Sequence, residues 1–468
     1  MTLSFSELAP DNLAVSLAAQ LRDMVAQGVL TRGDRLPSSR ALAKQLEIAR
    51  GTVITALETL VAEGILEARH GSGTFVSVAC TATALLDAAD APPLGVRDAQ
   101  PDVDVSSLAP INFQPCRPSL EAFPQGAWRR CMADAASAMP SSDYGDPQGE
   151  LELRVAIASY LCRARGLDIE ADQIIVTNGA IAAIDLVARQ YLNPGDGCVF
   201  ENPGYPLARQ VFAGHGATMC EIGVDEEGLM TGALPRGPQR IRLAYLTPSH
   251  QFPTGSRLSL ARRRKILDWA CEQRVLILED DYDGEFRYDI APLPPMISMA
   301  PCGHVLYLGT FSKTLFPSLR IGYAAGDRRI IRRLTALRVA TDYQTNSLVQ
   351  RGLARFIASG QFERYVQKMR RRYAHKRQQL QRAIETVGLN AKLMGMASGL
   401  NAQLRIDAHP TATNIAHRAS LQGVDIAPIG RYAGQQAVTD NALVLGYAAS
   451  SDEQIQRGVE TLARVMRD

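Results

Sequence analysis

The chain has 468 residues, which exceeds the length at which a single hydrophobic core stops growing, so we expect two or more domains. Hydrophobic residues make up 46% of the sequence, as in ordinary globular proteins, and the formal net charge of +2 identifies no partner. No apolar stretch is long enough to span a bilayer, and the N-terminus lacks the basic start and apolar run of a secretory signal. These features predict a cytoplasmic protein without membrane contact.

Eight cysteines lie scattered along the chain, with no C-x-x-C pair and no cluster of cysteine and histidine at metal-ligand spacing. We therefore expect no metal site. We also predict reduced, mostly buried thiols at Cys80, Cys116, Cys131, Cys162, Cys198, Cys220, Cys271 and Cys302.

The composition changes twice along the chain, which predicts three regions. Residues 1–78 combine helical patterns with a short Gly-rich, β-prone end, and we expect one small, mainly helical domain there. Residues 79–110 are rich in Ala, Asp and Pro without steady periodicity, which is typical of an exposed linker. Residues 111–468 form the third and largest region.

The third region has the pattern of an α/β fold, because short apolar runs alternate with longer helical patterns. We predict a mainly parallel sheet in a large subdomain over about 140–340, followed by a small α+β subdomain over about 341–468. The expected strands cover residues 174–177, 197–201, 243–247, 275–279 and 305–309.

Residues 327–386 are predicted to be helical and are very basic, above all around 368–377. A positive face of this kind could bind DNA phosphates electrostatically. We favour the alternative of a solvated helix, because basic side chains on helix surfaces usually face water.

Two short helices across a tight turn are predicted in the first region. After the turn that starts at Gly33, Pro37 and a Ser cap begin the first helix. The second helix begins near Arg50 and stops at Gly64. This pattern is typical of a helix-turn-helix, with Arg50 and Thr52 at the start of the recognition helix.

A two-stranded hairpin is predicted directly after these helices, over 65–76. Its tip, Gly71-Ser72-Gly73, carries no bulky side chain, so its backbone could approach a phosphate. Residues 33–76 resemble the GntR-type winged helix motif by motif, which implies binding to a double-stranded DNA operator with repeated half-sites. Our candidate DNA contacts are Arg35, Ser38, Arg40, Arg50, Thr52, Arg69, His70, Gly71, Ser72 and Gly73.

The charge of this module is not basic overall, since residues 1–80 hold seven Lys and Arg against eight Asp and Glu. The stretch 31–50 is biased positive, which could suffice for a local phosphate track. Ala49 stands where the GntR family usually has a Ser cap. A small helical docking domain is the alternative interpretation, and the wing disfavours it.

Lys313 is a candidate for covalent chemistry and follows the apolar strand predicted over 305–309. The hydroxyl residues Thr310 and Ser312 precede it, and Arg320 follows seven residues later. A shielded lysine amine condenses with aldehydes, and an arginine with hydroxyls suits a phosphate. The pattern therefore fits a Schiff base between Lys313 and pyridoxal 5'-phosphate.

Acidic residues end the strand predicted over 275–279. Pyridoxal phosphate is an electron sink only while its ring nitrogen stays protonated, and a buried carboxylate such as Asp280 enforces this by pairing with it. Tyr282 lies on the same face of an extended chain and could donate to the phenolic oxygen of the cofactor. For Asp281 and Asp283 we favour turn formation or helix capping.

Two further turns complete the candidate site. The segment 174–180 runs from a strand through Gly179 into a helix that starts near Ile181, so its backbone N–H groups could hold the phosphate. Tyr205 follows another predicted strand and offers an aromatic face to the pyridine ring.

Residues from about 111 to 465 resemble a fold-type I, class I aminotransferase, and the fusion with the winged helix resembles the MocR (GabR-like) branch of the GntR family. By this resemblance Lys313 carries the internal aldimine, Asp280 pairs with the ring nitrogen, and Tyr282 with the phenolic oxygen. The residues that the resemblance assigns to the phosphate are Asn178, Gly179, Ala180, Thr310, Ser312 and Arg320.

The resemblance also implies a homodimer, because Tyr144 matches the tyrosine that reaches the phosphate of the neighbouring subunit. Arg431 matches the arginine that binds a substrate α-carboxylate. Class I enzymes usually have Asn directly before Pro-Thr-Gly, but this chain has Phe252 there, so the second partner of the phenolic oxygen stays open. In the phosphate turn, Asn178 and Ile181 replace the Ser and Gln common in the MocR branch.

The fusion predicts a transcription regulator that senses an amine or amino acid, or pyridoxal phosphate itself, through the Lys313 aldimine. The alternative is a working aminotransferase with an accessory DNA-binding module. A sensor and an enzyme need the same residues, because the freed lysine is also the base of the proton shift, so partial transamination stays open. The sequence identifies no effector, no target gene and no direction of regulation.

Overall fold

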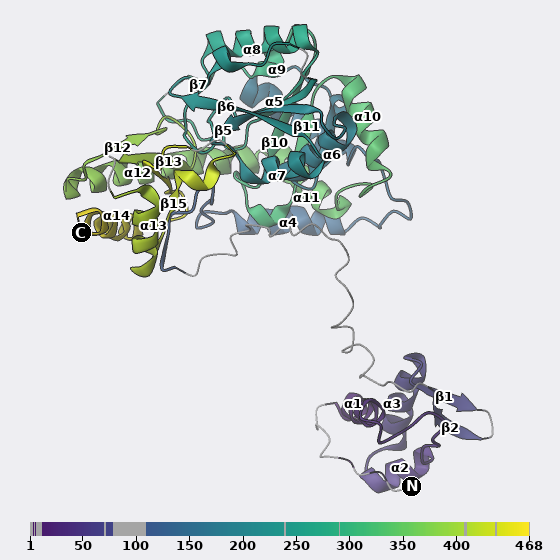
Figure 1. Cartoon of the computed structure of the whole chain (residues 1–468). Coiled ribbons are helices and arrows are strands. Elements are labelled where there is room, and N and C mark those ends of the chain that lie inside the picture. Colours follow the sequence, from purple (N-terminus) through teal and green to yellow (C-terminus); the bar gives the residue numbers. More distant parts are fainter. Residues whose placement is uncertain are drawn as a thin grey trace. The chain divides into compact units, whose positions relative to one another are not determined.

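A computed structural model describes residues 3, 5, 12–69, 72–77, 109–237, 240–289, 291–406, 410–435 and 438–467. The chain divides into two compact units, Met1–Val103 and Asp104–Asp468 (Figure 1). Nearly all of the expected linker, and the candidate wing residues His70 and Gly71, lie outside the described residues.

The first unit is a helix-turn-helix followed by a hairpin, as the sequence predicts. Its core is formed by aliphatic side chains such as Leu42 and Leu60, which no solvent reaches. In the antiparallel hairpin Leu66 pairs with Val76 and Arg69 with Gly73. The elements are α1 (Leu13–Ala26), α2 (Ser39–Leu46), α3 (Arg50–Ala62), β1 (Leu66–Arg69) and β2 (Gly73–Val76).

The ends of α2 and α3 follow the local chemistry of the sequence. Ser38 caps α2, because its Oγ accepts a hydrogen bond from the Ala41 amide at 3.2 Å. Glu47 takes a left-handed backbone conformation after α2 and opens the turn into α3. Ala49 precedes α3 without a side-chain cap, as its identity requires.

The second unit contains an eight-stranded sheet in the order β4-β11-β10-β9-β8-β5-β6-β7. The strands from β10 to β6 are parallel, whereas β11 and β7 pair antiparallel with their neighbours. The mainly parallel sheet is therefore confirmed. The strands are β4 (Ile174–Thr177), β11 (Gly322–Ala325), β10 (Val305–Thr310), β9 (Leu276–Asp280), β8 (Ile241–Leu246), β5 (Gly197–Asn202), β6 (Thr218–Asp225) and β7 (Gly228–Leu229).

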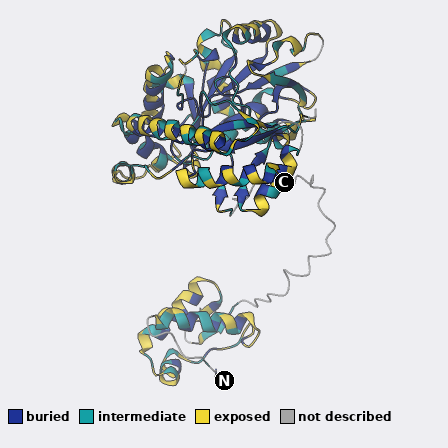
Figure 2. Ribbon diagram, turned by 90° about the vertical axis from the view of Figure 1, so that its left-hand side faces the viewer, coloured by how far each residue is buried: buried dark blue, intermediate teal, exposed yellow. Residues whose placement is uncertain are grey.

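Helices cover both faces of this sheet, and β4, β5, β9 and β11 are buried along their whole length. The helices α6, α7 and α10 pack on one face, and α5, α8 and α11 pack on the other. The helices are exposed along their outer sides and buried where they pack inward (Figure 2). The helices are α4 (Gln125–Ala136), α5 (Leu151–Arg165), α6 (Ala180–Tyr191), α7 (Pro206–Gly214), α8 (Leu260–Gln273), α9 (Met296–Met299), α10 (Arg328–Arg338) and α11 (Ser347–Ala358).

A smaller α+β part follows, built on the four-stranded sheet β12-β13-β16-β15. Helix α12 joins the two parts, since Phe362 and Tyr373 belong to the core of the large one and Leu380 and Ile384 to the core of the small one. Its elements are α12 (Gln361–Val387), β12 (Ala391–Met394), β13 (Asn401–Ile406), α13 (Ala412–Leu421), β14 (Val424–Asp425), which pairs with β3 (Ile111–Asn112), β15 (Ala427–Pro428), β16 (Ala442–Gly446) and α14 (Asp452–Arg467).

The basic stretch of α12 is solvated only in part, because Lys368 and Arg371 are exposed as we expected and other basic side chains have partners within the unit. Arg372 forms an ion pair with Glu121 at 2.5 Å, and Arg370 donates to the Glu285 carbonyl. Lys376 is buried and donates to the Ala448 carbonyl. The positive charges hold α12 against the rest of the unit, because their partners come from segments distant in sequence.

The cysteines also differ from the prediction of reduced, mostly buried thiols. Cys271, near the end of α8, and Cys302, before β10, form a disulfide with their Cα atoms 6.0 Å apart. Among the free cysteines that the structure describes, only Cys198 is buried and Cys162 is exposed. The pairing arises because the crossover from α8 to β10 brings together two segments 31 residues apart.

None of the described helices combines the length and the apolar composition that crossing a membrane requires.

Candidate cofactor site and DNA-binding surface

The candidate cofactor residues lie where strands of the large sheet end. Asp280 ends β9, Thr310 ends β10, and Asn178 follows β4. These strands run in the same direction, since β11 is antiparallel to both β10 and β4. The residues therefore meet at the carboxyl edge of the sheet, where open α/β folds bind ligands.

Asp280 is a buried carboxylate with one unsatisfied oxygen. Its exposed fraction is 4%, and its Oδ2 accepts a 2.6 Å hydrogen bond from the hydroxyl of Tyr245. Its Oδ1 is buried and has no partner among the described residues. Burial raises the pKa of Asp280 to about 7, against the lowering effect of the Tyr245 hydrogen bond. A protonated ring nitrogen would supply the missing partner, so Asp280 fits the pyridine of pyridoxal phosphate.

Lys313 is half-buried just beyond the end of β10. Its ammonium lies near enough to Asp280 and Cys116 to lower the pKa of both, although burial outweighs this effect. The Thr310 hydroxyl accepts from the Ser312 amide at 3.2 Å, which fixes the turn that leads to the lysine. The structure thus brings the predicted lysine and the predicted carboxylate together.

The turn between β4 and α6 lies directly against Arg320. Gly179 has a φ of +81°, and a Cβ at this position would lie 2.9 Å from Nη2 of Arg320. The same guanidinium donates to the Asn178 carbonyl at 2.9 Å, while the Asn178 side chain donates to Asp342. Ala180 is the first residue of α6, so helix N–H groups and a guanidinium converge on one point, as an anion site requires.

An aromatic wall forms one side of the candidate site. The ring of Phe252 contacts Tyr205, Tyr282 and Tyr432 edge to face, with centroids 5.8, 6.0 and 5.1 Å away. Burial, followed by the charge of Asp280, raises the pKa of Tyr205. This wall suits the face of a pyridine ring.

Tyr282 contacts a buried histidine that the sequence analysis did not assign to the site. Its hydroxyl lies 2.9 Å from Nδ1 of His250, and Oδ2 of Asp283 lies 2.9 Å from the same nitrogen. The sequence signal for His250 was indirect, because it stands in the run where the usual Asn is missing.

Helix capping, one of the two roles that we favoured for Asp281 and Asp283, is wrong, whereas the Asp283 carbonyl does form a turn by accepting from the Phe286 amide. Asp281 forms a 2.9 Å ion pair with Arg165 and accepts a 2.6 Å hydrogen bond from Tyr307. Burial raises the pKa of Asp281, but the charge of Arg165, the Tyr307 hydrogen bond and the charges of two further arginines together outweigh it, and the pKa is lowered. Asp283 accepts from His250 and from the Leu400 amide. Neither side chain caps a helix, because both are buried against partners distant in sequence.

Arg431 is half-buried in a short 3-10 helix, Ile429–Tyr432, beside the aromatic wall. Arg209 of α7 fixes this segment, donating to the carbonyls of Tyr432 and Ala433 at 3.2 and 3.0 Å. Our sequence analysis missed Arg209, since nothing local distinguishes it from a surface arginine. Tyr144 lies on an exposed loop, is 76% exposed and packs its ring on Tyr343.

The candidate DNA contacts cluster at the starts of α2 and α3 and on the hairpin. Arg35, Arg40 and Arg50 are exposed, and Arg50 donates to the Ser39 hydroxyl at 3.2 Å. Thr52 is half-exposed in the first turn of α3.

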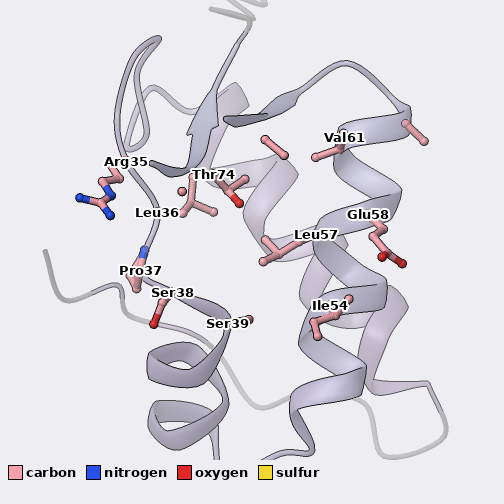
Figure 3. Close-up of a pocket in the computed structure, with 13 residues that line it drawn as sticks. Arg35, Leu36, Pro37, Ser38, Ser39, Ile54, Leu57, Glu58, Val61 and Thr74 are labelled. Carbon is pink, nitrogen blue, oxygen red and sulfur yellow. The ribbon is translucent and has the colours of Figure 1, made fainter. Parts of the chain in front are cut away.

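Between these helices and the hairpin lies a groove of about 560 Å³. Figure 3 shows Arg35 and Ser38 on one side of it and Ile54, Glu58 and Val61 of α3 on the other. On the wing, Arg69 stacks over Phe75, and Ser72 and Gly73 are exposed.

Comparisons with known proteins match both units. Residues 13–76 match the family "Bacterial regulatory proteins, gntR family", and residues 115–461 match "Aminotransferase class I and II". The HTH-type pyridoxine biosynthesis transcriptional regulator PdxR of Corynebacterium glutamicum is 34% identical over 96% of this chain and 94% of its own length. The probable rhizopine catabolism regulatory protein MocR of Rhizobium meliloti is 33% identical over 95% and 92%. This chain belongs to the MocR-like branch of the GntR family.

Solved structures similar to the body of this MocR-like chain are aminotransferases. The kynurenine aminotransferase of Pyrococcus horikoshii, in complex with PMP, has a TM-score of 0.71 and 28% identity, and the match covers 77% of this chain and 91% of that one. LysN of Thermus thermophilus, complexed with a phosphopyridoxyl leucine, has a TM-score of 0.69 and 26% identity, with coverages of 76% and 92%. The MocR-like chain is a DNA-binding transcription regulator with a pyridoxal phosphate fold, which confirms the regulator hypothesis over that of an enzyme with an accessory module.

Substitution of Gly179 tests the phosphate turn. We expect Gly179→Ala to weaken binding of pyridoxal phosphate roughly tenfold or more, because the new Cβ displaces Arg320 and removes a charged hydrogen bond. Absorbance titration of the apo protein with the cofactor measures this. Gly195→Ala is the matched control, since Gly195 also has a positive φ. A Cβ on Gly195 would have no neighbour within 4 Å, and Gly195 precedes β5 at the amino ends of the parallel strands. Equal affinities for the two variants would contradict the assignment.

Substitution of Arg50 tests the recognition helix. We expect Arg50→Ala to weaken DNA binding roughly tenfold or more, with a shallower dependence on salt where the side chain contacts a phosphate. Fluorescence anisotropy with DNA selected on the full-length protein measures both quantities. The control is Arg457→Ala, an exposed arginine of α14. An Arg50 variant that binds like this control would exclude Arg50 from the interface.

Proposed function

We propose that the aminotransferase-like body senses an amine or amino acid through Lys313 and that the winged helix transmits the result to operator DNA. One observation carries this proposal: Asp280 keeps a buried oxygen without a partner beside Lys313, in a chain that also carries a helix-turn-helix. A buried carboxylate of this kind is costly unless a cation pairs with it.

Each residue at the carboxyl edge has a part in this proposal. Pyridoxal phosphate, when bound, supplies the aldehyde that amines exchange on. Asp280 would keep its ring nitrogen protonated, Tyr282 would donate to its phenolic oxygen, and Tyr205 would offer its aromatic face to the ring. Its phosphate is held by Asn178, Gly179, Ala180, Thr310, Ser312 and Arg320.

Arg431 gives the sensor its preference for effectors with a carboxylate. A guanidinium binds a carboxylate through two parallel hydrogen bonds. Arg431 lies beside the aromatic wall that lines the site, and Arg209 fixes the backbone next to it. An amino acid could therefore present its amine to Lys313 and its carboxylate to Arg431.

We infer that two copies of the chain act together. The exposed ring of Tyr144 is available to a second copy, where it would reach that copy's phosphate site. A twofold dimer presents two winged helices, which matches an operator with repeated half-sites. Such a regulator works in the cytoplasm, where chromosomal DNA is accessible.

DNA binding under controlled ligand conditions tests the sensor. Operator affinity of the full-length protein is measured by anisotropy without cofactor, with pyridoxal phosphate, and with cofactor plus a panel of amines and amino acids. We expect the affinity to depend on the ligand in the wild type and not in Lys313→Ala, which keeps the helix-turn-helix intact. Identical affinity in the wild type under every condition would refute the proposal. A response to cofactor alone that Arg431→Ala leaves unchanged would identify the cofactor itself as the signal.

Residual transamination is the second candidate function, favoured by the proximity of Lys313 to Asp280. The same lysine that binds the cofactor is the base that a full transamination needs. Steady-state assays with amino donors and keto acceptors separate the candidates. We expect at most slow half-reactions, visible as single-turnover spectral changes, and sustained turnover with any pair would establish an enzyme.

A further inference from the structure

Three buried groups form a chain behind the candidate cofactor site: Tyr282, His250 and Asp283, which are 8%, 2% and 1% exposed. Both neighbouring oxygens contact the same atom of the histidine, its Nδ1, at 2.9 Å each. A nitrogen between two oxygens can satisfy both of them only as a shared donor.

The surroundings of Asp283 decide where the protons lie. Its Oδ2 also accepts from the Leu400 amide at 3.3 Å, and its negative charge raises the pKa of His250, so this oxygen belongs to a carboxylate that can only accept. Nδ1 of His250 therefore carries a hydrogen. It follows that the oxygen of Tyr282 is an acceptor toward His250 and that the tyrosine's own hydrogen points elsewhere.

The histidine ring cannot turn away from this arrangement, because glycines enclose it. A Cβ at Gly255 would lie 3.0 Å from Nε2, and a Cβ at Gly399 would overlap Cε1 and Nδ1. Nε2 is buried and has no hydrogen-bond partner among the described residues. Burial lowers the pKa of His250, but the charge and hydrogen bond of Asp283 outweigh it and the pKa is raised.

The orientation of the Tyr282 hydroxyl matters because Phe252 stands where class I enzymes usually have an Asn. Phe252 occupies the position directly before Pro-Thr-Gly, and its side chain contacts Tyr282 through an aromatic ring that carries no polar donor. Burial raises the pKa of the Tyr282 hydroxyl, and the charges of Asp283, Cys116, Asp280 and Tyr245 raise it further. The hydroxyl therefore stays protonated, and what its neighbours can change is the direction in which its O–H bond points.

We propose that His250 is a positioning residue that aims the Tyr282 hydroxyl at the phenolic oxygen of bound pyridoxal phosphate, and that Asp283 keeps the His250 donor in place. The proposal rests on the cofactor site described above. It assigns no bond making to His250, which acts only through Tyr282. In this chain, which lacks the usual Asn, the support of the phenolic oxygen would therefore come from Tyr282 as oriented by His250.

The test is a double-mutant cycle read from the pH dependence of the visible absorbance of the cofactor-loaded, full-length protein. His250→Leu removes the donor to Tyr282, and Tyr282→Phe removes the hydroxyl. Without a donor the phenolic oxygen is more negative and holds the neighbouring proton more tightly, so the midpoint rises. We expect each single variant to raise it by roughly one to two pH units, as one hydrogen bond to a charged group implies. The double variant should show no further rise, because His250 acts through the tyrosine.

Conservative variants separate positioning from folding. His250→Asn keeps a donor near the place of Nδ1 and should restore part of the wild-type midpoint, while Asp283→Asn should raise the midpoint less than His250→Leu. Additive shifts in the double variant, or a wild-type midpoint in both His250→Leu and Asp283→Asn, would overturn the proposal. A wild-type protein that gains no visible band with pyridoxal phosphate would instead refute the cofactor site. A His250→Leu protein that fails to fold leaves the decision to the two conservative variants.

Discussion

The half-satisfied carboxylate of Asp280 constrains the whole body of this regulator. It lies at the end of a central strand, and Tyr245 satisfies one oxygen while the other stays without a partner among the described residues. Leaving a buried acceptor unpaired costs roughly 1–3 kcal/mol, and more for a charged group. Burial raises the pKa of Asp280, since a protonated carboxyl is easier to bury. A cationic ring nitrogen reverses both effects, so cofactor binding and stability of the fold are linked.

Asp281, the next residue, is held in the opposite state. Arg165 and Tyr307 compensate its charge, and its pKa is lowered although it is equally buried. Successive residues of an extended chain point to opposite faces, so one carboxylate serves the site and the other anchors the layer behind it. The contrast between the two acids therefore depends on their tertiary partners.

This dependence on tertiary partners explains which features could be predicted from the sequence and which could not. The apolar runs predicted the parallel strands because burial on both faces requires continuous hydrophobicity, and the Ser38 cap and the hairpin followed from local chemistry. The positions of Lys313 and Asp280 followed from strand ends. The roles of Asp281 and Asp283 did not, since Arg165 and His250 reach them only through the fold. The disulfide and the ion pairs of α12 could not be predicted for the same reason, because each joins segments that are distant in sequence.

The site is built from residues of both parts of the body, so a bound ligand could shift one part relative to the other. Arg431 and the loop with Gly395 and Gly399 belong to the smaller part, whereas Lys313, Asp280 and His250 belong to the larger one. Gly255 and Gly395 approach so closely that a Cβ on either would meet the backbone of the other. A ligand that bridges Lys313 and Arg431 would therefore act on the contact between the two parts, and α12, which belongs to both cores, would carry that change through the body. Because packed cores shift between discrete arrangements and deform little, even a small effector can select one arrangement over another.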